Sequence, residues 1–222
     1  MPPARPARKG AAIGATVAVT LIVAGSLTAA GVYAYDHLTT AGPRTVPGLP
    51  TDPCGALGED VLDGLGAEPD SQGTMRYETG CTWEAEVDGR EATLNARWIA
   101  PYAESDADLV DRYGDEEAPR DTDSAYEQRI EQASEPDLYA PEEAEADSEE
   151  RDLGLGEESV LVLTTIDDGL AYADDREQRA SVVVREGEVV GTLTLALSDE
   201  ADEIDIDDAE DLLGDAAAEA FG

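Results

Sequence analysis

Lysine and histidine are almost absent from this chain of 222 residues, in which Lys9 and His37 are the only members of these two types. Cysteine occurs twice, as Cys54 and Cys81, and aromatic residues make up only 5% of the chain. The glycine-rich phosphate-binding patterns GxxxxGKS/T and GxGxxG are also missing. The chain therefore has few of the residues that a nucleophilic triad, a metal centre or a nucleotide site requires.

Positive charge of any kind is scarce. The chain has 14 basic and 52 acidic side chains, a net charge of −38, and from Asp36 onward 11 basic groups face all 52 acidic ones, a net charge of −41. Nucleic acids and anionic lipid surfaces are bound by Lys and Arg fields, so we predict no nucleic-acid partner. The near-absence of lysine has two explanations, GC-rich coding or an acidic surface that stays hydrated at high salt.

Two acidic stretches, 142–152 and 202–211, are compatible with loosely bound cations. Neither these stretches nor Asp167-Asp168-Gly169 matches the twelve-residue calcium loop, which needs glycine at position six and glutamate at position twelve. We therefore expect no dedicated metal site and no cofactor.

One segment, Ala11 to Tyr35, is 25 residues long and carries no charged side chain. As a helix it would extend roughly 37 Å, enough to cross about 30 Å of hydrocarbon with some tilt. We predict an uncleaved transmembrane signal anchor over 11–35. The alternative is a signal peptide cleaved near Val32-Tyr33-Ala34, although the apolar part of such peptides normally has about 7–15 residues.

The flanking charges predict the orientation of this segment. Arg5, Arg8 and Lys9 precede it, so residues 1–10 are expected to form a cytoplasmic tail and the chain beyond the membrane to be extracytoplasmic. Residues 36–52, rich in Thr, Pro and Gly, predict a stalk, and 53–222 an acidic domain. His37 lies in this stalk, which excludes a Ser-His-Asp or Cys-His centre inside the domain.

Cys54 and Cys81 both fall on the predicted outer side, where disulfides persist. A redox pair or a metal site would require CxxC spacing or further ligands, and neither is present. We predict a structural disulfide. It would close a loop of 28 residues and stabilise the fold by about 3.5 kcal/mol in the chain-entropy model.

Two β-hairpins are predicted. Alternation of apolar and polar residues predicts the first, which joins 81–87 to 92–98 through Asp88-Gly89. Strand-forming residues on both sides of Glu186-Gly187 predict the second, which joins 180–185 to 189–197. The continuous apolar run 159–166 predicts a buried central strand. Trp83 and Trp98 fall on the buried face of the first hairpin, which favours core packing over a sugar-stacking platform.

Helical periodicity accounts for the rest of the domain. Helices are expected at 56–65, around Leu109 and Tyr113, around Tyr126 and Ile130, and from about Asp208 to the C-terminus. Ser124 with Glu127 predicts a capping box for the third helix, and Asp207 with Glu210 suits the N-terminus of the last. Residues 140–152 lack an apolar period and predict a mobile acidic loop. The fold class is thus α+β: an N-terminal transmembrane helix followed by one antiparallel-sheet domain with packed helices.

Two short motifs resemble a known family. Asp52-Pro53-Cys54-Gly55-Ala56-Leu57 and Gly80-Cys81-Thr82-Trp83 resemble those of a family of small actinobacterial extracytoplasmic proteins, often lipoproteins, of unknown function. That family pairs a Pro-Cys motif with a later Cys-x-Trp motif on a strand, so the resemblance implies a Cys54–Cys81 disulfide. It implies no activity.

Because the chain has 52 carboxylates, no particular pair of them can be singled out as catalytic from the sequence. We therefore identify no catalytic residue. We expect a non-catalytic binding or interaction domain of the cell envelope, anchored in the cell membrane, with an unknown envelope protein or small ligand as its partner. The alternative is a cell-envelope hydrolase that uses two carboxylates about 5–10 Å apart in apolar walls.

Overall fold

The structure is a computed structural model that describes residues 45–87, 89–113, 117–135, 144–167, 176–197 and 203–221. Contacts divide the chain into two units, Met1–Arg44 and Thr45–Gly222, and the second is described below. The predicted tail, membrane segment and first half of the stalk lie outside the described residues. Within the described ranges, no helix has both the length and the apolar character that crossing a membrane requires.

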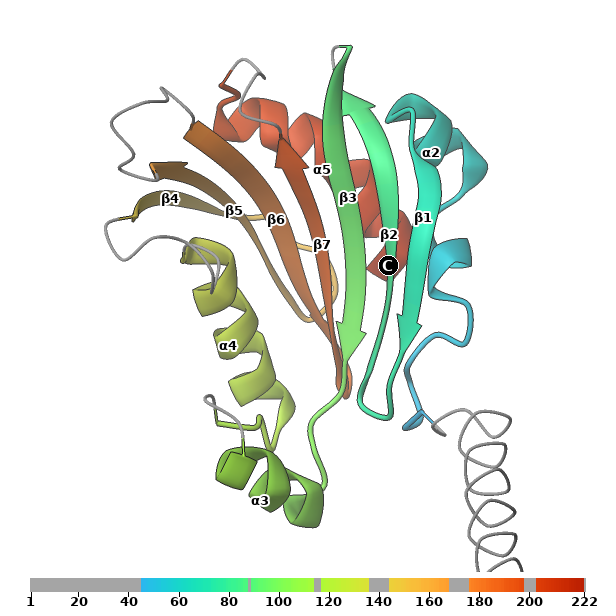
Figure 1. Ribbon diagram of the computed structural model, residues 1–222, viewed down its shortest axis with the longest axis vertical. Helices are drawn as coiled ribbons and strands as arrows, with labels where there is room; N and C mark the ends of the chain where they lie inside the picture. The colour runs from blue at the N-terminus through green and yellow to red at the C-terminus, as the bar shows by residue number, and fades with distance from the viewer. Residues whose placement is uncertain are drawn as a thin grey trace, which may run out of the picture. The chain divides into compact units, whose positions relative to one another are not determined.

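Seven antiparallel strands form one sheet in the order β1-β2-β3-β7-β6-β5-β4 (Figure 1). This sheet confirms the α+β class and the single antiparallel sheet. Both predicted hairpins are present, as β2–β3 and β6–β7. The strands are β1 Glu68–Thr74, β2 Glu78–Val87, β3 Arg90–Ile99, β4 Glu145–Asp152, β5 Glu158–Asp167, β6 Arg176–Glu186 and β7 Val189–Leu197.

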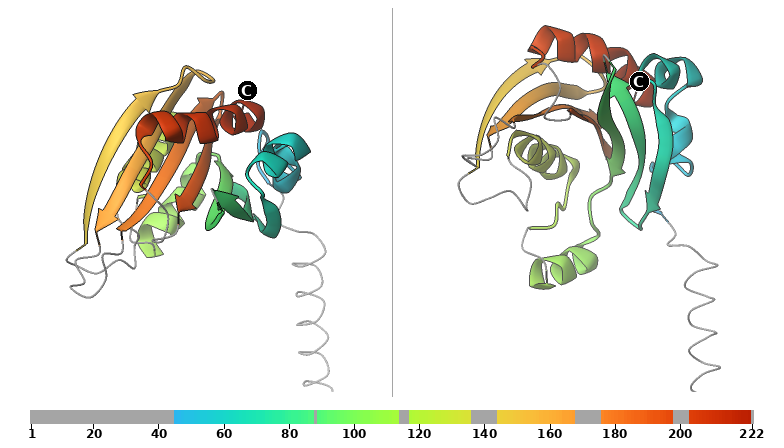
Figure 2. Two further views of the ribbon diagram at one scale, coloured as in Figure 1. Left: turned by 90° about the horizontal axis from the view of Figure 1, so that it is seen from above. Right: turned by 45° about the horizontal axis from the view of Figure 1, so that its top comes forward.

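Helices lie on both faces of the sheet (Figure 2). They are the 3-10 helix η1 Pro53–Ala56 and the α-helices α2 Glu59–Gly64, α3 Glu104–Tyr113, α4 Thr122–Ser134 and α5 Ile206–Phe221. The main core lies between α5 and one face of the sheet, where Trp83, Leu195 and Leu213 are fully buried. Trp98 meets Phe221 edge to face with 5.4 Å between ring centroids, so both tryptophans are core residues, as predicted.

The N-terminal part of this unit is held to β2. Cys54 on η1 and Cys81 on β2 lie at disulfide distance, with sulfur atoms 1.99 Å apart and Cα atoms 5.1 Å apart. Leu49 is buried in the main core, and the Val46 N–H donates to the carbonyl of Arg76. Residues 45–52, which we assigned to the stalk, therefore pack on the domain, because Val46 and Leu49 supply apolar surface that the core accommodates.

The predicted acidic loop at 140–152 is wrong over its second part. Residues 145–152 form strand β4, which pairs with β5 along its whole length. Seven of its eight residues are exposed, because an edge strand can obtain backbone hydrogen bonds without burying either face. Its charges also discourage pairing with a further chain. Strand β1 at the opposite edge is exposed throughout. It was not predicted, because a strand that buries neither face shows no alternation of apolar and polar residues.

Helix boundaries differ from the predictions in three places. The helix expected at 56–65 is divided into η1 and α2. Helix α4 begins earlier than expected, and its capping box is Asp121 with Ser124 rather than Ser124 with Glu127. Helix α5 begins at Ile206, where Asp205 accepts hydrogen bonds from the N–H groups of Asp207 and Asp208. For α4 and α5, Asp121 and Asp205 supply the hydrogen-bond acceptors for free N–H groups of the first turn, whereas α2 follows Gly58 without a side-chain cap.

Candidate functional site: a groove beside helix α4

The sheet face opposite α5 is polar over the middle of four adjacent strands. In register, Thr82 of β2 lies opposite Asn95 of β3, which lies opposite Thr194 of β7, which in turn lies opposite Ser181 of β6. The Asn95 amide donates to the Thr82 hydroxyl at 2.8 Å, and the hydroxyls of Ser181 and Thr194 are 3.0 Å apart. This alignment forms a continuous row of hydrogen-bonding side chains across the sheet.

A second row lies one step along the strands on the same face. Gly80, Arg97, Thr192 and Val183 occupy successive positions on β2, β3, β7 and β6. A Cβ atom on Gly80 would lie 2.9 Å from the Ala96 carbonyl oxygen and 3.2 Å from Cγ of Arg97. The absence of a side chain at position 80 therefore gives space to the arginine.

Helix α4 covers only part of this face. It packs against β5, β6 and β7, where Ala125 and Ala133 meet a small apolar cluster that includes Val160, Val162 and Val183. Toward β2 and β3 most strand residues turned to this face are polar and are not covered by α4 (Figure 2). Ile99 at the end of β3 is the exception and belongs to the apolar cluster. The boundary between the covered and uncovered parts is a groove.

We call this hollow the α4 groove. Its volume is about 330 Å³, and it is bounded by one side of α4 and by strands β3, β6 and β7. Its lining residues are Asn95, Arg97, Arg129, Gln132, Ala133, Glu177, Arg179, Ser181, Thr192, Thr194 and Ala196.

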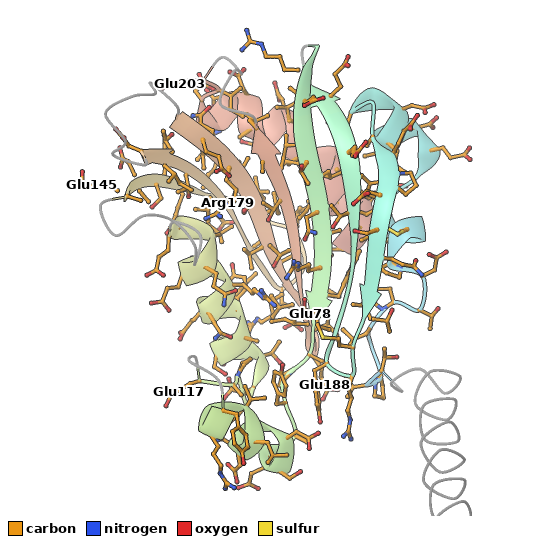
Figure 3. The ribbon with its side chains drawn as sticks, viewed as in Figure 1. Glu78, Glu117, Glu145, Arg179, Glu188 and Glu203 are labelled. Atoms are coloured by element: carbon orange, nitrogen blue, oxygen red, sulfur yellow. A yellow bond between two sulfur atoms is a disulfide. The ribbon has the colours of Figure 1, made fainter. Side chains whose placement is uncertain are left out.

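Arg179 holds the end of α4 against the sheet. Its side chain is buried, and its guanidinium donates to the carbonyls of Gln132, Ala133 and Glu135 at the C-terminal end of the helix (Figure 3). A cation suits this position, because the last carbonyls of a helix lack intrahelical partners and carry partial negative charge. The hydroxyl of Thr164 also donates to the carbonyl of Ala133, at 2.8 Å.

Arg97 and Arg129 share one carboxylate, that of Glu78. The Glu78 Oε1 atom is 3.3 Å from Nη1 of Arg97, and its Oε2 atom is 3.4 Å from Nη2 of Arg129. Arg97 also donates to the amide oxygen of Asn95, and Arg129 to that of Gln132. The polar side chains of β2, β3 and α4 are thereby linked into one network along the groove.

Tyr102, which is close to this network, and Tyr126 on α4 have raised pKa values. Burial raises the pKa of Tyr102, and the negative charge of Glu78 raises it further, while Arg129 acts in the opposite direction. Burial also raises the pKa of Tyr126 on α4 to about 12, assisted by the charge of Glu158. Both phenols are neutral at physiological pH.

The charge of the α4 groove is opposite to that of the molecule. Its lining contains three arginines and one glutamate, Glu177, a formal charge of +2, which the adjacent Glu78, paired with two of these arginines, reduces to +1. A second hollow, between α4 and residues 117–121, is lined by six carboxylates and one arginine, Arg120. A third, beside the β2–β3 hairpin, is lined by four glutamates and no basic residue. Of these three hollows, the α4 groove is the one suited to an anion.

The structure does not gather the acidic stretches into a metal site. In the part of the chain that is described, no group of three or more His, Cys, Asp and Glu side chains is placed to hold a metal ion. In the stretch 202–211, Asp205 caps α5, while Asp207 and Glu210 both bind Arg151, at 2.5 and 2.8 Å. These carboxylates thus already have partners within the protein.

No family model, curated protein or solved structure matches this chain. The resemblance based on the Pro-Cys and Cys-x-Trp motifs therefore stays a prediction. The candidate site rests on the geometry of the chain's own residues.

The residues of the α4 groove were not predicted from the sequence. Arg97, Arg129 and Arg179 come from β3, α4 and β6, so no local pattern joins them. One signal was present: apart from Glu91 at the start of β3, the polar positions that alternate with the apolar ones on β3 and β7 are uncharged or basic, namely Thr93, Asn95, Arg97, Thr192 and Thr194. In so acidic a chain, consecutive strands with few carboxylates on their polar faces indicate a special surface.

Proposed function

We propose that this chain is a membrane-anchored, extracytoplasmic binding domain and that the α4 groove is its ligand site. The observation that carries the proposal is the reversed charge of the groove. Three of the 11 arginines beyond Asp36 line one hollow of a chain with a net charge of −38. A surface under selection only for solubility or salt tolerance has no need for such a concentration of positive charge.

The groove chemistry favours binding over the alternative, a hydrolase with two carboxylates. Among the described residues that line the groove, Glu177 is the one carboxylate, and Glu78 beside the groove is already paired with Arg97 and Arg129. Acid–base cleavage of a glycosidic bond needs a second carboxylate about 5–10 Å away, with one of the two in apolar surroundings. Arginines, hydroxyls and amides instead provide orientation and specificity for a ligand that leaves unchanged.

The proposed location is supported by the sequence. Residues 11–35 are uncharged and follow three positive charges, which favours an anchored chain with its domain outside. The Cys54–Cys81 pair at disulfide distance suits that oxidising compartment. The partner is then a component of the cell envelope or a small solute that reaches it.

The binding function is tested by closing the groove. Ala196 lies on its floor, and Ala196→Phe would fill it without removing a hydrogen-bonding group. Ala146 on β4 is exposed and far along the sheet order from the groove strand β7, so Ala146→Phe is the matched control. Full-length protein in mild detergent would be incubated with a small-molecule extract of the host envelope and analysed by native mass spectrometry.

We expect one small molecule to be retained, unmodified, by the wild type and by Ala146→Phe and to be lost from Ala196→Phe. Retention by Ala196→Phe would show that the groove is not the site. Release of cleavage products would support the hydrolase instead.

A further inference from the structure

We propose that the ligand of the α4 groove is a small oxyanion that also carries hydroxyl groups, and that its anionic group replaces Glu78 between Arg97 and Arg129. This inference rests on the proposed function, because it specifies the ligand of the same groove. The shared chemistry is a carboxylate or phosphate on a polyhydroxylated molecule.

The contacts between Glu78 and its two arginines are long. Charge-assisted N–H···O hydrogen bonds normally measure about 2.7–2.9 Å, whereas Glu78 contacts its two arginines at 3.3 and 3.4 Å. One carboxylate thus serves two guanidinium groups at long range. A ligand anion between Arg97 and Arg129 could approach each of them in the planar, two-pronged geometry that arginine offers to carboxylates and phosphates.

An anion can reach the position between Arg97 and Arg129 from the side of Arg97. Its side chain is 50% exposed, whereas those of Arg129 and Glu78 are 17% and 23% exposed. Arg97 therefore contacts solvent and the groove at once, while Arg129 is held to the sheet by Glu78 of β2 and donates to Gln132 on its own helix. An incoming anion can meet Arg97 first without unpacking α4.

The floor of the groove supplies partners for hydroxyl groups. Thr192 lies beside Arg97, and Asn95 and Thr194 lie in the next row. Adjacent strands are about 4.8 Å apart, and successive residues on one face of a strand are about 6.8 Å apart. One molecule of sugar size therefore spans Arg97 and both rows at once.

The volume of the groove limits the size of the ligand. Its volume of about 330 Å³ is at the lower end of the range of about 300–1,000 Å³ that is usual for ligand pockets. A single sugar-sized unit fits this space better than a long chain. The strongly acidic surface elsewhere repels anions, so binding at this groove should not be obscured by other weak sites.

Isothermal titration calorimetry of the full-length protein tests the inference, with glucuronate, glucose 6-phosphate and glucose as probes. The two anions distinguish a carboxylate ligand from a phosphate ligand, and glucose is the neutral control. We expect at least one anion to bind at least ten times more tightly than glucose. A tenfold ratio corresponds to about one charge-assisted hydrogen bond that the anion makes and glucose does not.

Four variants locate the site. Arg97→Gln should weaken binding of the anion about tenfold or more, and Thr192→Val, which keeps the shape of the side chain, about threefold to tenfold. Glu78→Gln should strengthen binding, because it removes the competing negative charge. Arg112→Gln, at an exposed arginine of α3, should leave binding unchanged.

Three results would overturn the inference: no binding of either anion, equal binding of glucose, or unchanged affinity in both Arg97→Gln and Thr192→Val. If glucose binds as well as the anions and Ala196→Phe abolishes that binding, the groove remains a ligand site and only the anionic chemistry is wrong. If Ala196→Phe leaves all binding unchanged, the proposed function fails with it.

Discussion

Arg179 has a structural role within the candidate site. Its buried guanidinium donates to three carbonyls at the end of α4, one of which, that of Ala133, also accepts from the Thr164 hydroxyl. The same residue lines the groove. Stability of the helix and shape of the site therefore depend on one side chain.

We predict that Arg179→Met lowers the free energy of unfolding by about 3 kcal/mol, because carbonyls that accept from a charged donor would lose that donor. Chemical denaturation of the full-length protein measures this loss. Hydrogen exchange should show the fastest new exchange in α4. The exposed Arg112→Met is the control, and a loss no larger than the control's would contradict the role given to Arg179.

At the scale of whole elements, α4 determines the groove because it covers one half of a sheet face and leaves the other half open. Its position depends on its two ends. Asp121 and Ser124 form a reciprocal cap at the start, and Arg179 binds the end. The hydrogen bond from the Ser124 N–H, assisted by the Ser124 hydroxyl, lowers the pKa of the Asp121 carboxyl.

Asp121→Ala should lower the melting temperature at pH 7 by roughly 2–4 °C, the usual effect of losing an N-cap in a chain of this size. Because the pKa of Asp121 is lower in the folded state, its stabilising effect is present above the unfolded pKa of about 4 and is lost as the pH falls further. The difference between wild type and variant should therefore shrink between pH 5 and pH 2. Thermal melts across this range test the prediction, with Glu131→Ala on the exposed side of α4 as control. A difference that stays constant with pH would contradict it.

The same elements show how far the sequence could predict the fold. Strands β2, β3 and β7 were predictable because each buries one face and alternates accordingly, whereas β6 is buried on both faces over 178–184 and was indicated by its β-branched residues and the Glu186-Gly187 turn. Strands β1 and β4 were not, because edge strands exposed on both faces require no alternation. The groove arginines were not predicted either, because the register that brings β3, β7 and β6 together is set by the packing of distant segments.

At the scale of the molecule, the main feature is the excess of negative charge. The chain carries −41 from Asp36 onward, far beyond the magnitude of about 2–8 that is sufficient for the solubility of a small domain. Several acidic groups are paired with arginines, as Asp108 and Asp111 are with Arg120. With 52 acids and 11 arginines in this region, most carboxylates remain exposed to mutual repulsion.

Stability should therefore rise with ionic strength. The Debye length falls from about 30 Å at 0.01 M to about 3 Å at 1 M salt, so distant carboxylates cease to repel one another. Thermal melts in NaCl and in tetramethylammonium chloride over this range measure the effect. Equal rises in both salts would indicate screening, and a larger rise in NaCl would indicate bound sodium. A flat or falling melting temperature would rule out the salt-adaptation hypothesis.

The location of the domain is a further prediction at this scale. Protease added to intact host cells should digest residues beyond the proposed anchor and leave residues 1–10 protected, because the positive charges at Arg5, Arg8 and Lys9 keep the N-terminus inside. Immunoblots against tags at the two ends give the result. Recovery of a soluble form that begins near Tyr35 would show instead that the apolar segment is a cleaved signal peptide.

The most direct test of the central claim, that the α4 groove binds an oxyanion, is nuclear magnetic resonance of the arginine side chains during titration with glucose 6-phosphate and with glucuronate. We predict that, with at least one of the two, the Nε–Hε signals of Arg97 and Arg129 shift together and saturably. The signals of Arg112 and Arg120, which lie outside the groove, should remain unchanged. Shifts spread over all exposed arginines, or no shift at Arg97 with either anion, would contradict the account.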